Sequence, residues 1–127
     1  MTYKNLIETM QLLAANVGNQ ETKVQKKLLK IHAKLKDYYE IYAELHSDLK
    51  LDNASVDDKG NVIMNEKGEY SFTKEGLKKL NKDVKELLDK EFEHKDIEVV
   101  NPQGLEEHTY LKGWVKGVNF NTDDDEA

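Results

Sequence analysis

The sequence predicts a mainly helical α+β domain, in which a long helix belongs to an antiparallel helical pair and a small β-hairpin is added. Three observations predict this fold class. A chain of 127 residues is enough for one domain with a modest core. One Pro, seven Gly and 35% charged residues are typical of a helix-rich protein. Apolar residues also recur at helical spacing over most of residues 1–121, which we take as the domain.

A first helix is expected at residues 3–16. Thr2 precedes it and can accept a hydrogen bond from the first turn, as an N-cap does. Leu6 and Leu13 belong to its apolar stripe, and Gly18 with its flanking Asn residues ends it.

A second helix is expected from Thr22, its predicted N-cap, to about Leu51, since this stretch holds neither Gly nor Pro. Its apolar residues alternate at steps of four and three, the repeat of a coiled-coil-like seam. The residues of this seam are Val24, Leu28, Ile31, Leu35, Tyr38, Tyr42, Leu45 and Leu49.

A β-hairpin is predicted at about residues 61–72, where a β-prone run, an "NEKG" turn and alternating aromatics follow one another. Thr73 is the expected N-cap of a third helix at about 74–92, whose apolar residues can pair antiparallel with the second helix. Beyond it, residues 96–100 are expected to form a strand and the following segment a short helix. Residues 122–127 are expected to form a disordered acidic tail carrying Asp123, Asp124, Asp125 and Glu126.

No motif of catalysis or metal binding is present in the sequence. The chain lacks Cys, and no two of its four His have the spacing of a helical zinc site. Its acids alternate with Lys at three- and four-residue steps, which indicates surface pairing. We therefore expect a protein that is not an enzyme, without catalytic residues, metal or cofactor.

The seam of the second helix is longer than the apolar stripe of the third. We expect the part from Leu28 to Tyr38 to pack partly on another copy, and the part from Tyr42 to Leu49 to contact the third helix. Tyrosines at seam positions fit a core and a protein interface equally well. The candidate interface residues are Leu28, Ile31, Leu35, Tyr38, Tyr39 and Tyr42.

The second helix also carries a candidate electrostatic face, at four- and three-residue steps, made of Lys23, Lys27, Lys30 and Lys34. This face could meet phosphates, or it could be a solvated flank that meets opposite charge. The net charge of −6 and the absence of Arg, since all 19 basic residues are Lys, argue against nucleic-acid binding. Charge is uneven, because residues 51–127 hold eleven Lys and nineteen acids.

The order of motifs resembles a family of small uncharacterised proteins of tailed phages of low-GC bacteria. The resemblance runs over about residues 25–120 and rests on "DYYEIYAEL", "DDKGNVIMNEKGEYSFT" and "LNKDVKELLDKE". It implies a phage or mobile-element origin and assigns no catalytic residue. The first helix and the acidic tail depart from the family pattern.

These observations predict a phage-type protein–protein interaction module, homo-oligomeric, that serves as a structural or assembly accessory. One alternative is an inhibitor that binds a host defence or DNA-handling protein through its acidic surface. A second is nucleic-acid binding by the Lys-rich helix. With neither a signal-peptide pattern nor a long apolar run, the expected location is the host cytoplasm, free or attached to the virion, and not a membrane.

Overall fold

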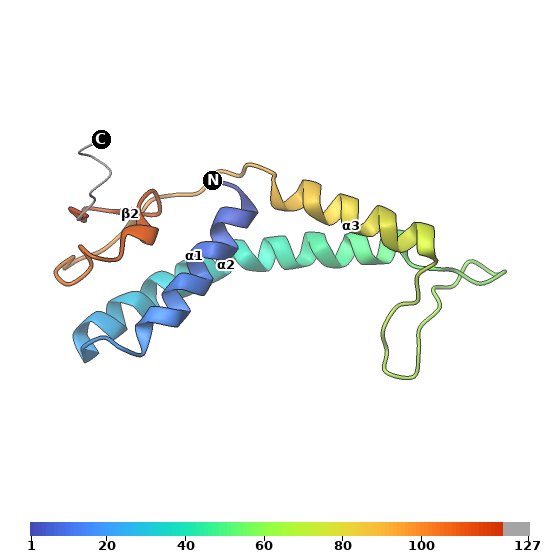
Figure 1. Ribbon diagram of the computed structural model, residues 1–127, viewed down its shortest axis with the longest axis horizontal. Coiled ribbons are helices and arrows are strands. Elements are labelled where there is room, and N and C mark those ends of the chain that lie inside the picture. Colours follow the sequence, from blue (N-terminus) through green and yellow to red (C-terminus); the bar gives the residue numbers. More distant parts are fainter. Residues whose placement is uncertain (121–127) are drawn as a thin grey trace.

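The computed structural model describes residues 1–120 and is mainly helical with a small two-stranded sheet, which confirms the predicted fold class (Figure 1). The helices are α1 (Tyr3–Val17), α2 (Thr22–Asn53) and α3 (Lys74–Leu88). After them come the strand β1 (Ile97–Glu98), a 3-10 turn η1 (Thr109–Leu111) and the strand β2 (Val115–Lys116).

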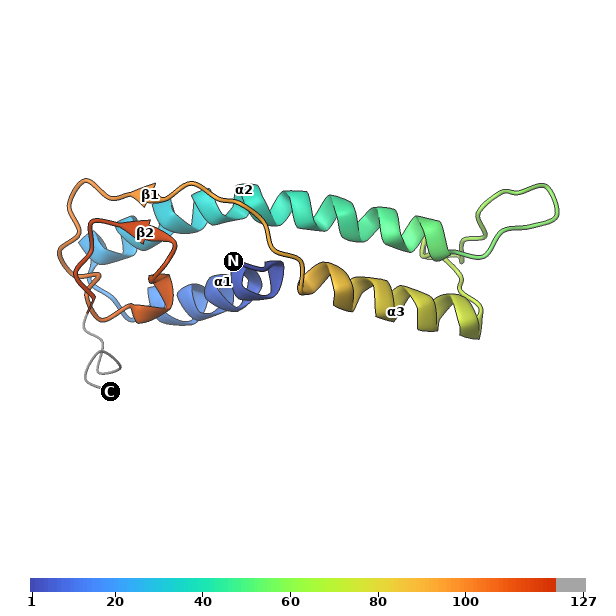
Figure 2. The same cartoon turned by 90° about the horizontal axis from the view of Figure 1, so that it is seen from above.

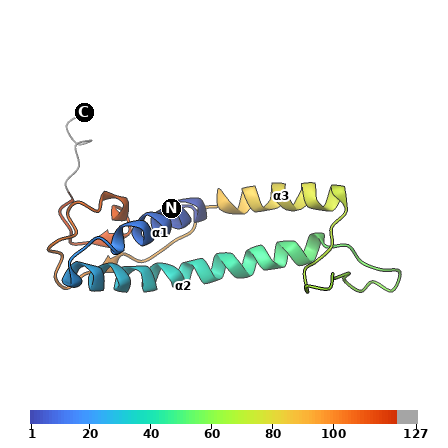
Figure 3. The same ribbon diagram turned by 60° about the horizontal axis from the view of Figure 1, so that its bottom comes forward.

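α2 is the central helix of the molecule, and α1 and α3 pack on it end to end (Figure 3). With 32 residues, α2 is about 48 Å long. α3 runs antiparallel to its second half, as predicted, and α1 runs antiparallel to its first half (Figures 1 and 3). The apolar seam of α2 is thus shared between two helices of the same chain.

A short junction joins the start of α1 to the chain that leaves α3. Thr2 and Glu91 form an antiparallel bridge, and the Phe92 N–H donates to the Met1 carbonyl at 3.0 Å. The amino terminus also contacts the Glu91 carboxylate at 2.7 Å. The Tyr3 ring stacks on Phe92 with centroids 4.6 Å apart. These contacts align α1 and α3 on one side of α2.

Two of the three predicted N-caps are confirmed. Thr2 forms a capping box with Asn5, and the Thr73 hydroxyl accepts from the Gly76 N–H at 2.9 Å. The third prediction was wrong by one residue, because the N-cap of α2 is Glu21 and Thr22 is already helical. The Glu21 side chain makes no capping hydrogen bond.

The largest part of the core lies in what we call the hub: α1, the first half of α2 and residues 92–120. Leu105, Leu111 and Trp114 from the C-terminal segment are fully buried there against the two helices. Buried polar groups are satisfied, since the Trp114 indole N–H donates to the Thr9 hydroxyl at 3.0 Å. The Thr9 hydroxyl in turn donates to the Asn5 carbonyl at 2.8 Å.

The β-structure differs from the predicted hairpin at 61–72. That stretch forms isolated bridges without a longer ladder: Met64 pairs with Tyr70 around the expected turn, and Val62 pairs with Val56 just before it. The sheet instead pairs β1 with β2 in parallel, with Ile97 opposite Val115. Figure 2 shows both strands beside the first half of α2, at the hub end of the molecule.

Candidate protein-interaction surfaces

The first candidate interface residues lie inside the core of a single chain. Leu28, Ile31 and Leu35 are fully buried within the hub, where α1 and the C-terminal segment pack on α2. The expectation that they contact another copy was therefore wrong, because they have no free surface to offer. The excess length of the α2 seam is covered by α1, whose own apolar stripe runs alongside it.

The three tyrosines have different environments. Tyr42 is buried, 5.5 Å from the Tyr3 ring, and this burial raises the pKa of its hydroxyl, with Tyr39 adding to the effect. The Tyr38 hydroxyl accepts a hydrogen bond from the Lys95 N–H at 3.0 Å and so holds the C-terminal segment on α2. Tyr42 and Tyr38 thus stabilise the folded chain, and Tyr39 is the exposed tyrosine of this group.

The lysine face is divided between two surroundings. Lys27 donates from Nζ to the Gln103 carbonyl at 2.6 Å, which ties the C-terminal segment to α2. Lys27, Lys30 and Lys34 line one cavity, whereas Lys23 is exposed outside it. The structure therefore brings three of the four lysines to a common groove.

The histidines are distributed over the molecule and pack mostly on aromatic rings. His46 stacks on Tyr42 at 5.8 Å, and His94 lies 4.5 Å from the Trp114 ring. His108 is buried, with Nδ1 2.9 Å from the Tyr110 hydroxyl. Burial lowers the pKa of both His46 and His108. In the part of the chain that the structure describes, no three His, Asp or Glu side chains form a group that could hold a metal ion.

The opposite end of the molecule is a thin distal arm, which we define as Tyr42–Asn53 of α2, the loop 54–73 and α3. Within residues 1–120, no further helix or strand covers this arm (Figure 2). Leu45, Leu49 and Leu87 line one cavity between α2 and α3, where the sequence predicted that the two helices pair. Asn53 also donates to the Asp83 carboxylate at 3.2 Å, which links α2 to α3.

Apolar side chains remain open along the arm. Leu77 of α3 is 47% exposed, and Val84, seven residues later on the same helical face, is only half-buried. At the tip, three further apolar side chains are exposed, those of Val56, Ile63 and Met64. Several exposed apolar side chains at one end of a molecule make that end a candidate protein-binding surface.

Opposite charges lie on the two helices of the arm. Within the arm, residues 42–53 of α2 carry three acids and one Lys, whereas α3 carries five Lys and three acids. The three acids of α2 recur every four residues and are all exposed; they are Glu44, Asp48 and Asp52. The arm thus presents an acidic helix beside a basic one.

The tip of the arm is a tandem pair of turns that the sequence analysis missed in part. Asp57 Oδ1 accepts from the Lys59 and Asn61 N–H groups, and Asn65 Oδ1 accepts from the corresponding groups eight residues later. Gly60 and Gly68 take positive φ at equivalent places. The signal was available as an eight-residue repeat, "VDDKGNV" followed by "MNEKGEY".

The repeat closes on itself through backbone hydrogen bonds. Ser55 donates to Ser71 at 2.8 Å, Ser71 donates to Ile63 at 3.0 Å, and Ile63 donates to Ser55 at 2.9 Å. These three residues are spaced eight apart and form a closed ring of bonds. The tip is therefore an ordered unit that presents its apolar side chains in a fixed arrangement.

The acidic tail residues Asp123, Asp124, Asp125 and Glu126 lie outside the described residues. Within residues 1–120, no helix combines the length and the apolar character needed to cross a membrane. No protein-family model matches the chain, and no curated protein or solved structure is significantly similar to it. Its surfaces have to be interpreted from their own chemistry.

Proposed function

We propose that this protein is a non-enzymatic association module that pairs with a second copy of itself through the distal arm. The observation that carries the proposal is an arm of two helices with open apolar side chains, Leu77 and Val84 among them. A helical pair of this kind normally buries such side chains beneath another layer. A second arm would supply that layer and complete a four-helix arrangement.

Charge complementarity favours a second copy as the partner. If α2 of one arm lies beside α3 of the other, the acidic helix of each copy meets the basic helix of its partner. A two-fold axis makes the two contacts equivalent, so one self-complementary surface is sufficient. We further propose a structural or assembly role in a phage-infected cell, which is supported by the resemblance of residues 25–120 to tailed-phage proteins.

Sedimentation equilibrium over a range of protein concentrations tests the proposal. We expect a species of twice 14.7 kDa that dissociates on dilution and dissociates more readily in high salt, because salt screens the contacts between opposite charges. Leu77→Asp should raise the dimer dissociation constant roughly tenfold or more, because it would bury a charge without a partner.

The matched control is Leu12→Asp. Leu12 is 48% exposed on α1, against 47% for Leu77, but it belongs to the hub. This variant should dimerise like the unmodified chain. A dimer that is lost in Leu12→Asp and retained in Leu77→Asp would show that the arm is not the interface.

The inhibitor alternative rests on the acidic balance of residues 51–127, which hold eleven Lys and nineteen acids and would imitate a phosphate backbone. α3 belongs to that half of the chain, and in the proposed dimer it lies against α2 of the second copy, so the two roles compete for it. A chain that stays monomeric at every concentration would contradict self-association and would leave the acidic half free for a basic partner.

A further inference from the structure

A second open surface lies on the hub, between α2 and the segment that contains β1. The cavity there has a volume of about 420 Å³ and is formed by one side of α2 and residues 97–101. Its floor is apolar, with Ile31 and Ile97 buried and Val99 half-buried. Val100 is fully exposed at its mouth. Val99 and Val100 are the apolar side chains open at this cavity, and such side chains can bind apolar groups of another molecule.

The rim of this groove is mostly cationic. Lys27, Lys30 and Lys34 lie along α2, and Glu98 is the acid among the lining residues. Since Lys27 is bound to the Gln103 carbonyl, Lys30 and Lys34 are the two ammonium groups best placed to meet a ligand. An anionic ligand is therefore favoured at this end.

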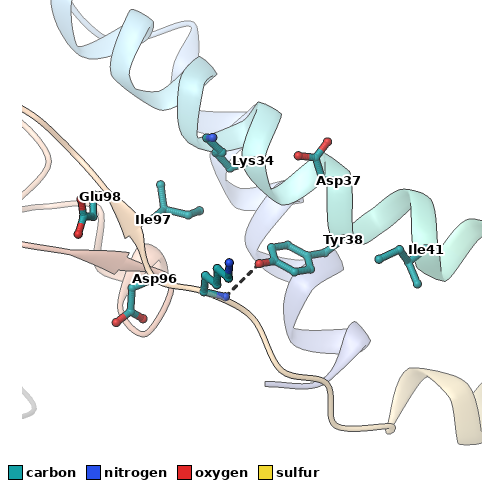
Figure 4. A pocket seen from close by; sticks show the side chains of 8 residues that line it. Lys34, Asp37, Tyr38, Ile41, Asp96, Ile97 and Glu98 are labelled. Atoms are coloured by element: carbon teal, nitrogen blue, oxygen red, sulfur yellow. Dashed lines mark hydrogen bonds between the residues drawn. The ribbon is translucent and has the colours of Figure 1, made fainter.

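The groove continues toward the middle of α2, where its charge changes. A second cavity, of about 560 Å³, shares Lys34, Ile97 and Glu98 with the first (Figure 4). The charged residues that it adds are two acids and one lysine: Asp37, Asp96 and Lys95. From Lys27 to Ile41 the groove follows about 21 Å of helix, the length of about six extended residues. A ligand that fills it is long, and its negative charge belongs at the Lys27 end.

The free edge of β1 adds a backbone feature to this groove. The Ile97 N–H donates to the Trp114 carbonyl at 2.9 Å, so Ile97 faces β2. Alternate residues of a strand direct their peptide groups to opposite sides, and the N–H and C=O of Glu98 therefore point away from β2. An edge of this kind can pair with an added strand.

We propose that this groove binds an extended acidic segment of a partner protein, which pairs with the open edge of β1. Apolar side chains of the segment occupy the floor, and carboxylates two residues apart meet Lys30 and Lys34. The distance between the two lysines matches the distance between the two carboxylates. From Lys30 to Lys34, α2 rises about 6 Å, and two residues of a strand span about 6.6–6.8 Å. This site belongs to the hub and does not depend on association through the arm.

Fluorescence anisotropy with a labelled octapeptide, in which two Asp alternate with three Val between flanking Gly and Ser residues, tests the proposal on the full chain. The peptide should bind, and a peptide with Asn in place of both Asp should bind more weakly. The double variant Lys30→Gln, Lys34→Gln should lose affinity roughly tenfold, as expected for two exposed charge contacts. The double variant Lys36→Gln, Lys50→Gln changes exposed lysines of α2 outside the groove and should bind normally.

A third peptide, methylated on the backbone nitrogen of the central Val, separates strand pairing from simple charge attraction. It keeps both carboxylates and removes a donor that the edge of β1 would use, so its affinity should fall. Equal affinity for the methylated peptide, equal loss in both double variants, or no binding at all would overturn the proposal. Tighter binding of oleate or of duplex DNA at the same lysines would also overturn it, in favour of another ligand class.

Discussion

His108 is a buried titratable side chain of the hub, and its surroundings favour the neutral imidazole. Desolvation lowers its pKa, an effect that the nearby carboxylates of Glu107 and Glu106 oppose. Nδ1 lies 2.9 Å from the hydroxyl of Tyr110, whose own pKa is raised by burial. His108 is also next to a fully buried part of the C-terminal segment, since Leu105 and Leu111 flank it in the core.

This lowered pKa predicts a loss of stability in mild acid. The unfolded chain binds a proton on His108 near the ordinary value of 6.5, whereas the folded chain binds it only at lower pH. The free energy of unfolding should therefore be retained above pH 6.5 and fall as the pH drops through the folded pKa. Urea unfolding from pH 7.5 to about pH 5 measures how the free energy of unfolding changes with pH. This pH interval lies above the range in which most carboxylates titrate.

His108→Gln should flatten that slope, because Gln does not titrate. His32→Gln is the matched control on a partly exposed position of α2. Part of the slope should persist in the His108 variant, since burial against Tyr42 also lowers the pKa of His46. An identical slope in the His108 variant and the unmodified chain would contradict the prediction.

At the scale of elements, the helices, their apolar faces and the pairing of α3 with α2 were predictable, but the position of α1 was not. Periodicity identifies the apolar face of α2, yet α1 and α3 carry similar stripes, and either could cover it. The arrangement is decided by the junction of Thr2 with Glu91 and by the ring of Tyr3 on Phe92. These contacts join the two ends of separate segments, and no local spacing indicates them.

β1 lies inside the strand predicted at residues 96–100, but β2 and the pairing of the two strands were beyond prediction for a different reason. β1 and β2 have two residues each and pair across a long connection, and two residues cannot show an alternating pattern. The groove on the hub depends on that sheet, so only its lysines could be identified from the sequence. The tandem turns of the tip were recognisable from their eight-residue repeat.

The start of α2 offers a prediction at this scale. Its N-cap, Glu21, has extended backbone angles but makes no side-chain capping hydrogen bond. Glu21→Ser should place a hydroxyl oxygen within reach of the first-turn N–H groups and stabilise the protein by about 0.5–1 kcal/mol. The urea midpoint should rise accordingly.

The opposite change provides the control. Thr73 does cap α3, and Thr73→Ala should cost about 1 kcal/mol. Opposite shifts of the two midpoints would agree with the capping argument. A destabilised Glu21→Ser would mean that the Glu21 carboxylate contributes more through its charge near the helix terminus than a hydroxyl gains by capping.

At the scale of the whole molecule, the hub and the arm differ in how much apolar surface they bury. The hub packs two helices and the C-terminal segment around fully buried side chains such as Leu28 and Trp114. The arm has two helices and a loop, and its buried side chains, Leu80 and Leu87, retain 6% and 8% exposure. Local stability follows buried apolar contact, so the arm is the part expected to open first.

Hydrogen–deuterium exchange at two protein concentrations tests this division together with the proposed dimer. At low concentration, amides of α3 should exchange faster than amides of α1, because α3 packs mainly on α2 alone whereas α1 packs on the core of the hub. Raising the concentration should slow exchange in α3 and in the second half of α2, since a second arm would cover them. The α1 amides report on the hub and should not respond. Equal protection of both helices at low concentration would contradict the division into hub and arm, whereas protection that rises in α1 alone would place the self-association on the hub.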